Sequence, residues 1–191
     1  MHNYEYIIAG LPALSQDGNG KIDAAGILAE IRSQLDARDN AAVSLLTDGW
    51  DSGKLNEAFY AAASRSGSRF IREYFDFDLH VRNTKVAWLN RTLGRPEDMD
   101  IMPGGSEDYD EEPAIEKILG TSDILARERG LDDAMWDKID SLTVMDVFDL
   151  DVILGFIAKL KIVDRWLQLD EGTGRELFHK LVKEIKENYN I

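Results

Sequence analysis

The feature that most constrains the fold is a run of apolar residues at helical spacing between residues 69 and 94. The residues of this stripe are Ile71, Phe75, Leu79, Val86, Leu89 and Leu93, separated by 4, 4, 7, 3 and 4 positions. This spacing places them on one face of an α-helix. Gly94 predicts where the helix ends. At 1.5 Å per residue such a helix is roughly 40 Å long.

Shorter segments with the same periodicity occur before and after this helix. They predict helices over residues 22–35, 40–46, 54–63, 123–129, 132–144, 150–167 and 170–189. Asp23 is a plausible N-cap for the first of these. Segment 150–167 is apolar on nearly every face, which predicts a central buried helix. No stretch alternates with a period of two for more than a few residues, so the sequence predicts an all-α helical bundle.

A strongly acidic segment separates the two halves of the chain. The segment from Pro96 through Glu116 contains nine acidic residues, Glu116 included, and no basic ones. This composition predicts that residues 95–113 form a mobile loop that is dispensable for folding. The expected organisation is an N-terminal helical region, residues 1–94, and a C-terminal helical region, residues 114–191. We expect these two regions to form one compact unit.

Composition and motifs exclude several classes of function. The chain has no cysteine, which excludes thiolate metal sites and thiol catalysis. The net charge of −14 disfavours nucleic acids and anionic membranes as partners. It fits either simple solubility, which is the favoured interpretation, or a basic protein partner. The longest apolar stretch is interrupted by Lys159 and Lys161, and the N-terminus has no features of a signal peptide. No phosphate-binding or nucleophile motif is present. The sequence therefore predicts a cytoplasmic protein that is not an enzyme.

Residues 15–26, SQDGNGKIDAAG, are similar to part of a calcium-binding EF-hand loop. With Gly20 at the sixth position, acidic or amide side chains occupy positions three, five and nine of the loop. Ser15 and Gly26, however, stand at the first and last positions, where the ion needs carboxylates. The favoured interpretation is a turn before a capped helix, and a calcium site remains the alternative.

Several segments together resemble a family of small bacterial proteins encoded among the components of V-type ATP synthases. One is the N-terminal YEYIIAGLPALS of residues 4–15. Another is LARER, residues 125–129, followed by Leu131, Asp132 and Trp136. The last is IAKLKIVDRW, residues 157–166, continuing through Leu169, Asp170 and Gly174 to Phe178. The order and spacing of these segments carry the resemblance.

That family in turn resembles a reduced version of the funnel-shaped, all-helical connector of archaeal-type ATPases. This connector sits on the membrane rotor ring and receives the foot of the central stalk. Residues 75–94 resemble a helical stretch of it, and the chain is far shorter than the complete connector. The resemblance implies a non-catalytic, cofactor-free adaptor that joins stalk and ring without inserting into the membrane itself.

Within residues 75–94 the candidate partner contacts are Arg82, Asn83, Asn90 and Arg91. For Arg82 and Arg91 the alternative is pairing with an acidic residue of the same chain. The expected partners are the central-stalk and membrane-ring components of the V-type ATP synthase, which would hold the chain at the cytoplasmic side of the membrane. The rival interpretations are a calcium-binding protein and an acidic module for protein interaction.

Overall fold

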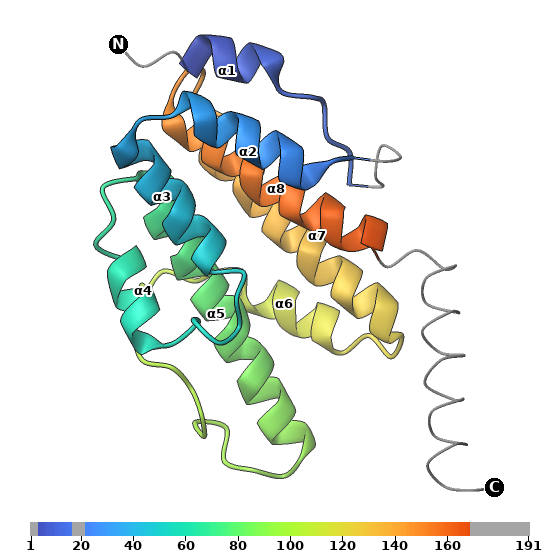
Figure 1. Ribbon diagram of the computed structural model, residues 1–191. Helices are drawn as coiled ribbons and strands as arrows, with labels where there is room; N and C mark the ends of the chain where they lie inside the picture. Colours follow the sequence, from blue (N-terminus) through green and yellow to red (C-terminus); the bar gives the residue numbers. More distant parts are fainter. Residues whose placement is uncertain (1–3, 17–21, 169–191) are drawn as a thin grey trace, which may run out of the picture.

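The computed structural model describes residues 4–16 and 22–168, and these residues form an all-α fold, as predicted (Figure 1). The predicted helix over 170–189 lies outside the described residues. The helices are α1 (Tyr4–Gly10), α2 (Ala24–Gln34), α3 (Ala37–Asp48), α4 (Glu57–Ala63), α5 (Arg69–Thr92), α6 (Glu112–Leu119), α7 (Ile124–Thr143) and α8 (Leu150–Gln168).

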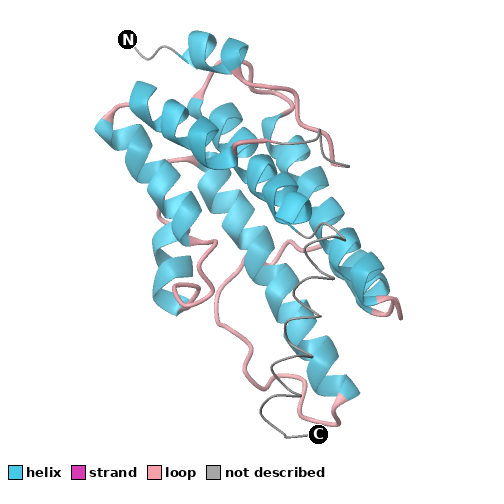
Figure 2. Cartoon of the chain, turned by 45° about the vertical axis from the view of Figure 1, so that its right-hand side comes forward, coloured by secondary structure: helices cyan, strands magenta, loops and turns pink. Residues whose placement is uncertain are grey.

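Helix α8 lies at the centre, and α1, α2, α3, α5 and α7 all pack against it (Figures 1 and 2). Ile153, Leu154 and Ile157 of α8 are completely buried. The prediction of a central buried helix is therefore confirmed. The main core also draws Phe70 and Ile71 from α5 and Ile139 from α7, so residues from both halves of the chain share one core.

Most helices begin where a short polar side chain caps the first turn. Asp23, Asp36, Asn56, Ser68 and Asp123 each accept a hydrogen bond from a backbone N–H two or three residues further on. These bonds satisfy donors that have no partner within the helix. The predicted capping role of Asp23 is confirmed.

Helix α5 ends at Thr92, and the glycine that the sequence predicts as its stop, Gly94, follows two residues later. This glycine has a φ of 66°, in the left-handed region that suits a residue without a side chain. The backbone N–H of Arg95 donates to the Asn90 carbonyl at 2.8 Å, and that of Gly94 donates to the Arg91 carbonyl at 3.2 Å. This pair of bonds is the Schellman arrangement that closes many helices.

Two predicted boundaries are wrong in the C-terminal half. The segments 123–129 and 132–144 form one continuous helix, α7, because Gly130 does not break it. A Cβ atom on Gly130 would lie 2.9 Å from the side chain of Ile118, so the glycine allows α6 to approach closely. Helix α6 was not predicted at all. Pro113 occupies its first turn, where the missing N–H of a proline does no harm.

The apolar stripe of α5 is buried over only half of its length. Ile71, Phe75 and Leu79 are at most 3 % exposed. Val86 is half-buried, and Leu89 and Leu93 are 41 % and 62 % exposed. The C-terminal end of α5 extends past the neighbouring described helices in both views (Figures 1 and 2).

Candidate interaction site along α5

The acidic segment that follows α5, residues 95–111, runs back along the helix and is called the strap below. The Asn90 side-chain amide donates to the Met99 carbonyl at 2.7 Å. Asn83 both donates to the Met102 carbonyl, at 2.9 Å, and accepts from its N–H, at 3.0 Å. Asp76 accepts from the backbone N–H and the hydroxyl of Ser106, at 2.8 and 2.7 Å. The strap is therefore attached to α5 at three points.

The three attachment points follow from matching lengths. Asp76, Asn83 and Asn90 are seven residues apart, close to two helical turns, so they lie on one face of α5. The fourteen residues from Asp76 to Asn90 rise about 21 Å along a helix. The seven residues from Met99 to Ser106 span about 23 Å when extended. An extended strap antiparallel to α5 thus meets every second turn of the helix.

Side chains of the strap also pack against the body. Met102 contacts the main core, and Tyr109 packs against the smaller core cluster that contains Phe77 and Ile115. The Tyr109 ring stacks on the His80 ring with their centroids 4.4 Å apart. Composition alone did not predict these contacts, because it counts the carboxylates of the strap and not its two half-buried apolar side chains. The expectation that the loop is mobile and dispensable for folding stays a prediction.

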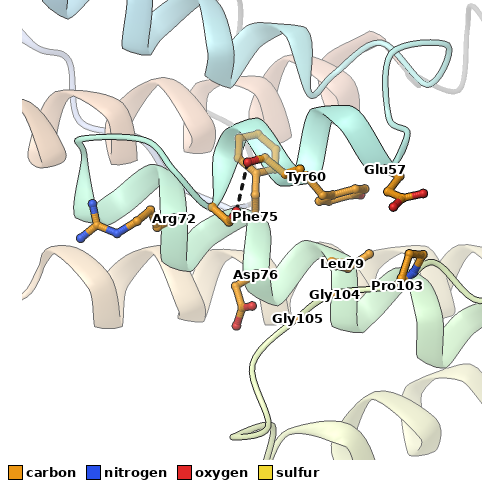
Figure 3. A pocket seen from close by; sticks show the side chains of 11 residues that line it. Glu57, Tyr60, Arg72, Phe75, Asp76, Leu79, Pro103, Gly104 and Gly105 are labelled. Atoms are coloured by element: carbon orange, nitrogen blue, oxygen red, sulfur yellow. Dashed lines mark hydrogen bonds between the residues drawn. The ribbon is translucent and has the colours of Figure 1, made fainter.

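Two glycines of the strap close a pocket between α4 and α5 (Figure 3). The pocket has a volume of about 290 Å³ and is lined mainly by Tyr60, Phe75 and Leu79, with Pro103, Gly104 and Gly105 along one side. Gly104 and Gly105 have φ values of 106° and 91°, and a Cβ atom on Gly105 would lie 2.8 Å from the His80 ring. Both positions therefore favour glycine for their conformation, and Gly105 also needs it for space.

The four predicted partner contacts all have internal contacts. Asn83 and Asn90 hold the strap, and Asn90 is only 4 % exposed. Arg91 pairs with Glu116 of α6. Arg82 lies close enough to Asp78 to favour the charged form of that carboxyl. The sequence signal for the strap was the heptad spacing of Asp76, Asn83 and Asn90, which an inspection of apolar positions alone overlooks.

A charged network joins α5, α7 and α8 beside the predicted contacts. Arg165 pairs with Glu128 at 3.1 Å and with Asp132 at 3.3 Å, and Lys85 pairs with Glu128 at 3.4 Å. The Trp166 indole N–H donates to Asp132 at 2.7 Å. Burial raises the pKa of Asp132, although Arg165 and Trp166 oppose the shift. The network links the three helices through their charged side chains.

Exposed apolar side chains gather at the two ends of α5. At its C-terminal end they are Leu89, Leu93, Met99 and Ile101, the last two belonging to the strap. Near its N-terminal end they are Val144, Met145, Val147 and Phe148 of the α7–α8 connection, which are 53–86 % exposed. Arg69, the first residue of α5, fixes this connection through Asp146, at 2.5 Å, and the Leu142 carbonyl, at 2.8 Å.

The described residues offer little for metal binding or membrane insertion. Among residues 4–16 and 22–168, no three His, Asp or Glu side chains are grouped so that they could hold a metal ion. Residues 17–21 of the EF-hand-like loop lie outside this part of the chain, so the absence of calcium binding stays a prediction. Over the same described ranges, no helix has the length and apolarity needed to cross a bilayer.

Residues 104–189 match one family model, described as "Protein of unknown function (DUF2764)". The match covers a little under half of the chain and includes the end of the strap and helices α6, α7 and α8. No curated protein and no solved structure matches the sequence. The class that the fold and the candidate site define is an all-α protein with apolar surface at both ends of one long helix.

Proposed function

We propose that this chain is a non-catalytic adaptor of a V-type ATP synthase, similar to the funnel-shaped connector of archaeal-type ATPases. In this role it joins the central stalk to the membrane rotor ring on the cytoplasmic side. The observation that supports an adaptor is the pair of exposed apolar regions at the two ends of α5. The 24 residues of this helix separate the regions by about 36 Å.

Exposed apolar groups are informative because they are unfavourable in water unless a partner covers them. Single exposed apolar residues are common, whereas clusters of several large ones mark interaction sites. Each cluster is held by a side chain of α5. Arg69 binds Asp146 in the α7–α8 connection, and Asn90 binds the backbone of the strap at Met99. A body with two such ends can bind two partners at once. The choice of an ATP synthase as the assembly rests on the sequence resemblance.

Co-expression with the central-stalk proteins of the same organism's V-type ATP synthase tests this proposal. We expect the chain to co-elute with them in size-exclusion chromatography, and to bind them more slowly at high salt because its charge of −14 favours a basic partner. If the chain never co-elutes with stalk or ring proteins, the adaptor role in this assembly is wrong.

A second candidate function is an acidic interaction module outside any ATPase. The exposed carboxylates of the strap favour it, since Glu97, Asp98 and Asp100 all face solvent. Such a module would bind a basic protein and would fail to co-elute with the stalk. The co-expression experiment therefore separates the two candidates.

A further inference from the structure

Three exposed apolar side chains at the C-terminal end of α5 are together called the tip: Leu89, Leu93 and Met99. They are 41 %, 62 % and 46 % exposed. Leu89 and Leu93 lie one turn apart on α5, on either side of Asn90 in the sequence. Met99 lies across from Asn90, because the amide of that residue donates to the Met99 carbonyl. Ile101 lines a hollow with Thr84 and Ala87, whereas Leu89 faces Arg82 and Lys85, so Ile101 lies on another side of α5 and is not part of the tip.

The tip is held in place by its supports. Asn90 is buried and bonds to the carbonyls of both Glu97 and Met99, at 3.5 and 2.7 Å. Asp100, between Met99 and Ile101, has a φ of 61°, a left-handed conformation that is unfavourable for most residues and tolerated best by Asn and Asp after Gly. Asp100 keeps this unfavourable conformation although its two large apolar neighbours, Met99 and Ile101, are exposed to water. Such an arrangement is expected where a partner covers the exposed groups.

The charges around the tip indicate the chemistry of that partner. Glu97, Asp98 and Asp100 are exposed beside Met99 and Ile101. Arg91 is paired with Glu116, which leaves Arg95 as the nearby positive charge of the strap. The rim is therefore acidic. A complementary surface has an apolar centre and a rim of Lys or Arg side chains.

We propose that the tip docks an amphipathic helical segment whose apolar face is flanked by basic residues. A second copy of this chain fits less well, because a two-fold contact would place the acidic rim against itself. A bilayer with anionic lipids would be repelled for the same reason. The inference deepens the adaptor role and rests on it for the identity of the natural partner. In this arrangement Asn90 is a positioning residue, and the docking contacts come from Leu93 and Met99.

The test uses the full chain and two synthetic helical peptides of about 21 residues, long enough to form a stable helix on binding. One peptide has a Leu face flanked by Lys, and the other has Glu in place of every Lys. The tip variant is Leu93→Ser with Met99→Ser. Its matched control, Met145→Ser with Phe148→Ser, removes two exposed apolar side chains at the other end of α5. All four positions are exposed, so circular dichroism and thermal midpoints should stay close to wild type.

We expect the Lys peptide to bind wild type and control alike in fluorescence anisotropy. The tip variant should lose about tenfold or more in affinity, as for central contacts of an interface. Neutralising the rim by Glu97→Gln, Asp98→Asn and Asp100→Asn should remove most of the salt dependence, and Asn at position 100 keeps the left-handed tolerance. Equal losses in the tip variant and its control would overturn the proposal, as would equal binding of the Glu peptide.

Repeating the co-expression with the central-stalk proteins separates this inference from the proposed function. If the tip binds the Lys peptide and the chain does not co-elute with the stalk, the tip inference stands and the ATPase role fails. If the chain co-elutes and the tip variant does so equally, with unchanged peptide binding, the tip inference fails and the adaptor role stands.

Discussion

Asp78 of α5 is a carboxylate whose environment favours its neutral form. The Tyr60 hydroxyl donates to it at 2.6 Å, and Arg82, one turn further along the helix, favours the charged form. Burial outweighs both and raises the pKa of Asp78 above its ordinary value of 3.8. Burial also raises the pKa of Tyr60, which therefore stays a hydrogen-bond donor at neutral pH.

The raised pKa of Asp78 predicts how stability changes with pH. The folded chain holds the Asp78 proton to a higher pH than the unfolded chain does. This contribution to the free energy of unfolding is present below pH 3.8 and is lost as the pH rises through the raised pKa. Asp78→Asn, which keeps an acceptor for Tyr60, should therefore be at least as stable as wild type at pH 7. Its stability should also fall less as the pH rises from 3.8 to 7.

Urea unfolding at several pH values measures this difference. The exposed Asp137→Asn removes one negative charge elsewhere on the surface and controls for the net charge. A loss of stability at pH 7 in Asp78→Asn, but not in the control, would show that the attraction to Arg82 outweighs the burial of Asp78.

At the scale of elements, the sequence predicted helices well where apolar periodicity and capping residues agree. Helix α5 begins after the Ser68 cap and ends before Gly94, close to the predicted bounds. Errors arose at Gly130 and Pro113, residues that end many helices and here lie inside one. For Gly130 the reason is tertiary contact with α6, which no local pattern records. The strap was missed because its attachment depends on polar side chains 7 to 30 residues away.

Gly155 of α8 provides a test of helix packing, because it lies where α5, α7 and α8 meet. A Cβ atom there would lie 2.7 Å from the Thr143 methyl, 3.3 Å from Ile139 and 3.5 Å from Phe70. Gly155→Ala gains about 1 kcal/mol of helix propensity but overpacks the core, at a cost of about 1–3 kcal/mol. We expect a net loss of about 1 kcal/mol in urea unfolding. The control is Gly10→Ala, where no atom lies within 4 Å of the added Cβ atom, and it should cause no loss of stability. If Gly155→Ala proves more stable than wild type, the Thr143 side chain rotates away freely.

At the scale of the whole molecule, one shared core and one long helix place two apolar ends at a fixed separation. Phe70 and Ile71 of α5 pack with Ile139 of α7 and Ile153 of α8, so the two halves of the chain support each other. Arg165 and Lys85 add charged contacts between the same helices. In the proposed adaptor role, a separation fixed in this way would transmit motion from one end of the molecule to the other, because no flexible joint lies between them along the continuous helix α5.

Two variants of the strap can show whether the net charge of this acidic chain or the contacts of its strap contribute more to the free energy of unfolding. Two variants can carry the same reduced charge. One replaces residues 97–110 by Gly and Ser at equal length, and the other changes only the six carboxylates of that segment to amides: Glu97, Asp98, Asp100, Glu107, Asp108 and Asp110. The second should be as stable as wild type or more so, because self-repulsion falls and the contacts remain.

The Gly/Ser variant should lose about 3 kcal/mol in the free energy of urea unfolding. The half-buried side chains of Met102 and Tyr109 contribute about 1 kcal/mol each. The Asn83 and Asn90 amides would lose well-placed hydrogen-bond partners in the strap, which costs about 1 kcal/mol more. The sequence composition alone predicts the opposite, a dispensable loop. If both variants unfold at the same urea concentration, the contacts of the strap contribute nothing and the composition argument holds. If only the Gly/Ser variant is weakened, the strap is an integral part of the fold, and the tip that it carries is held in place by the body.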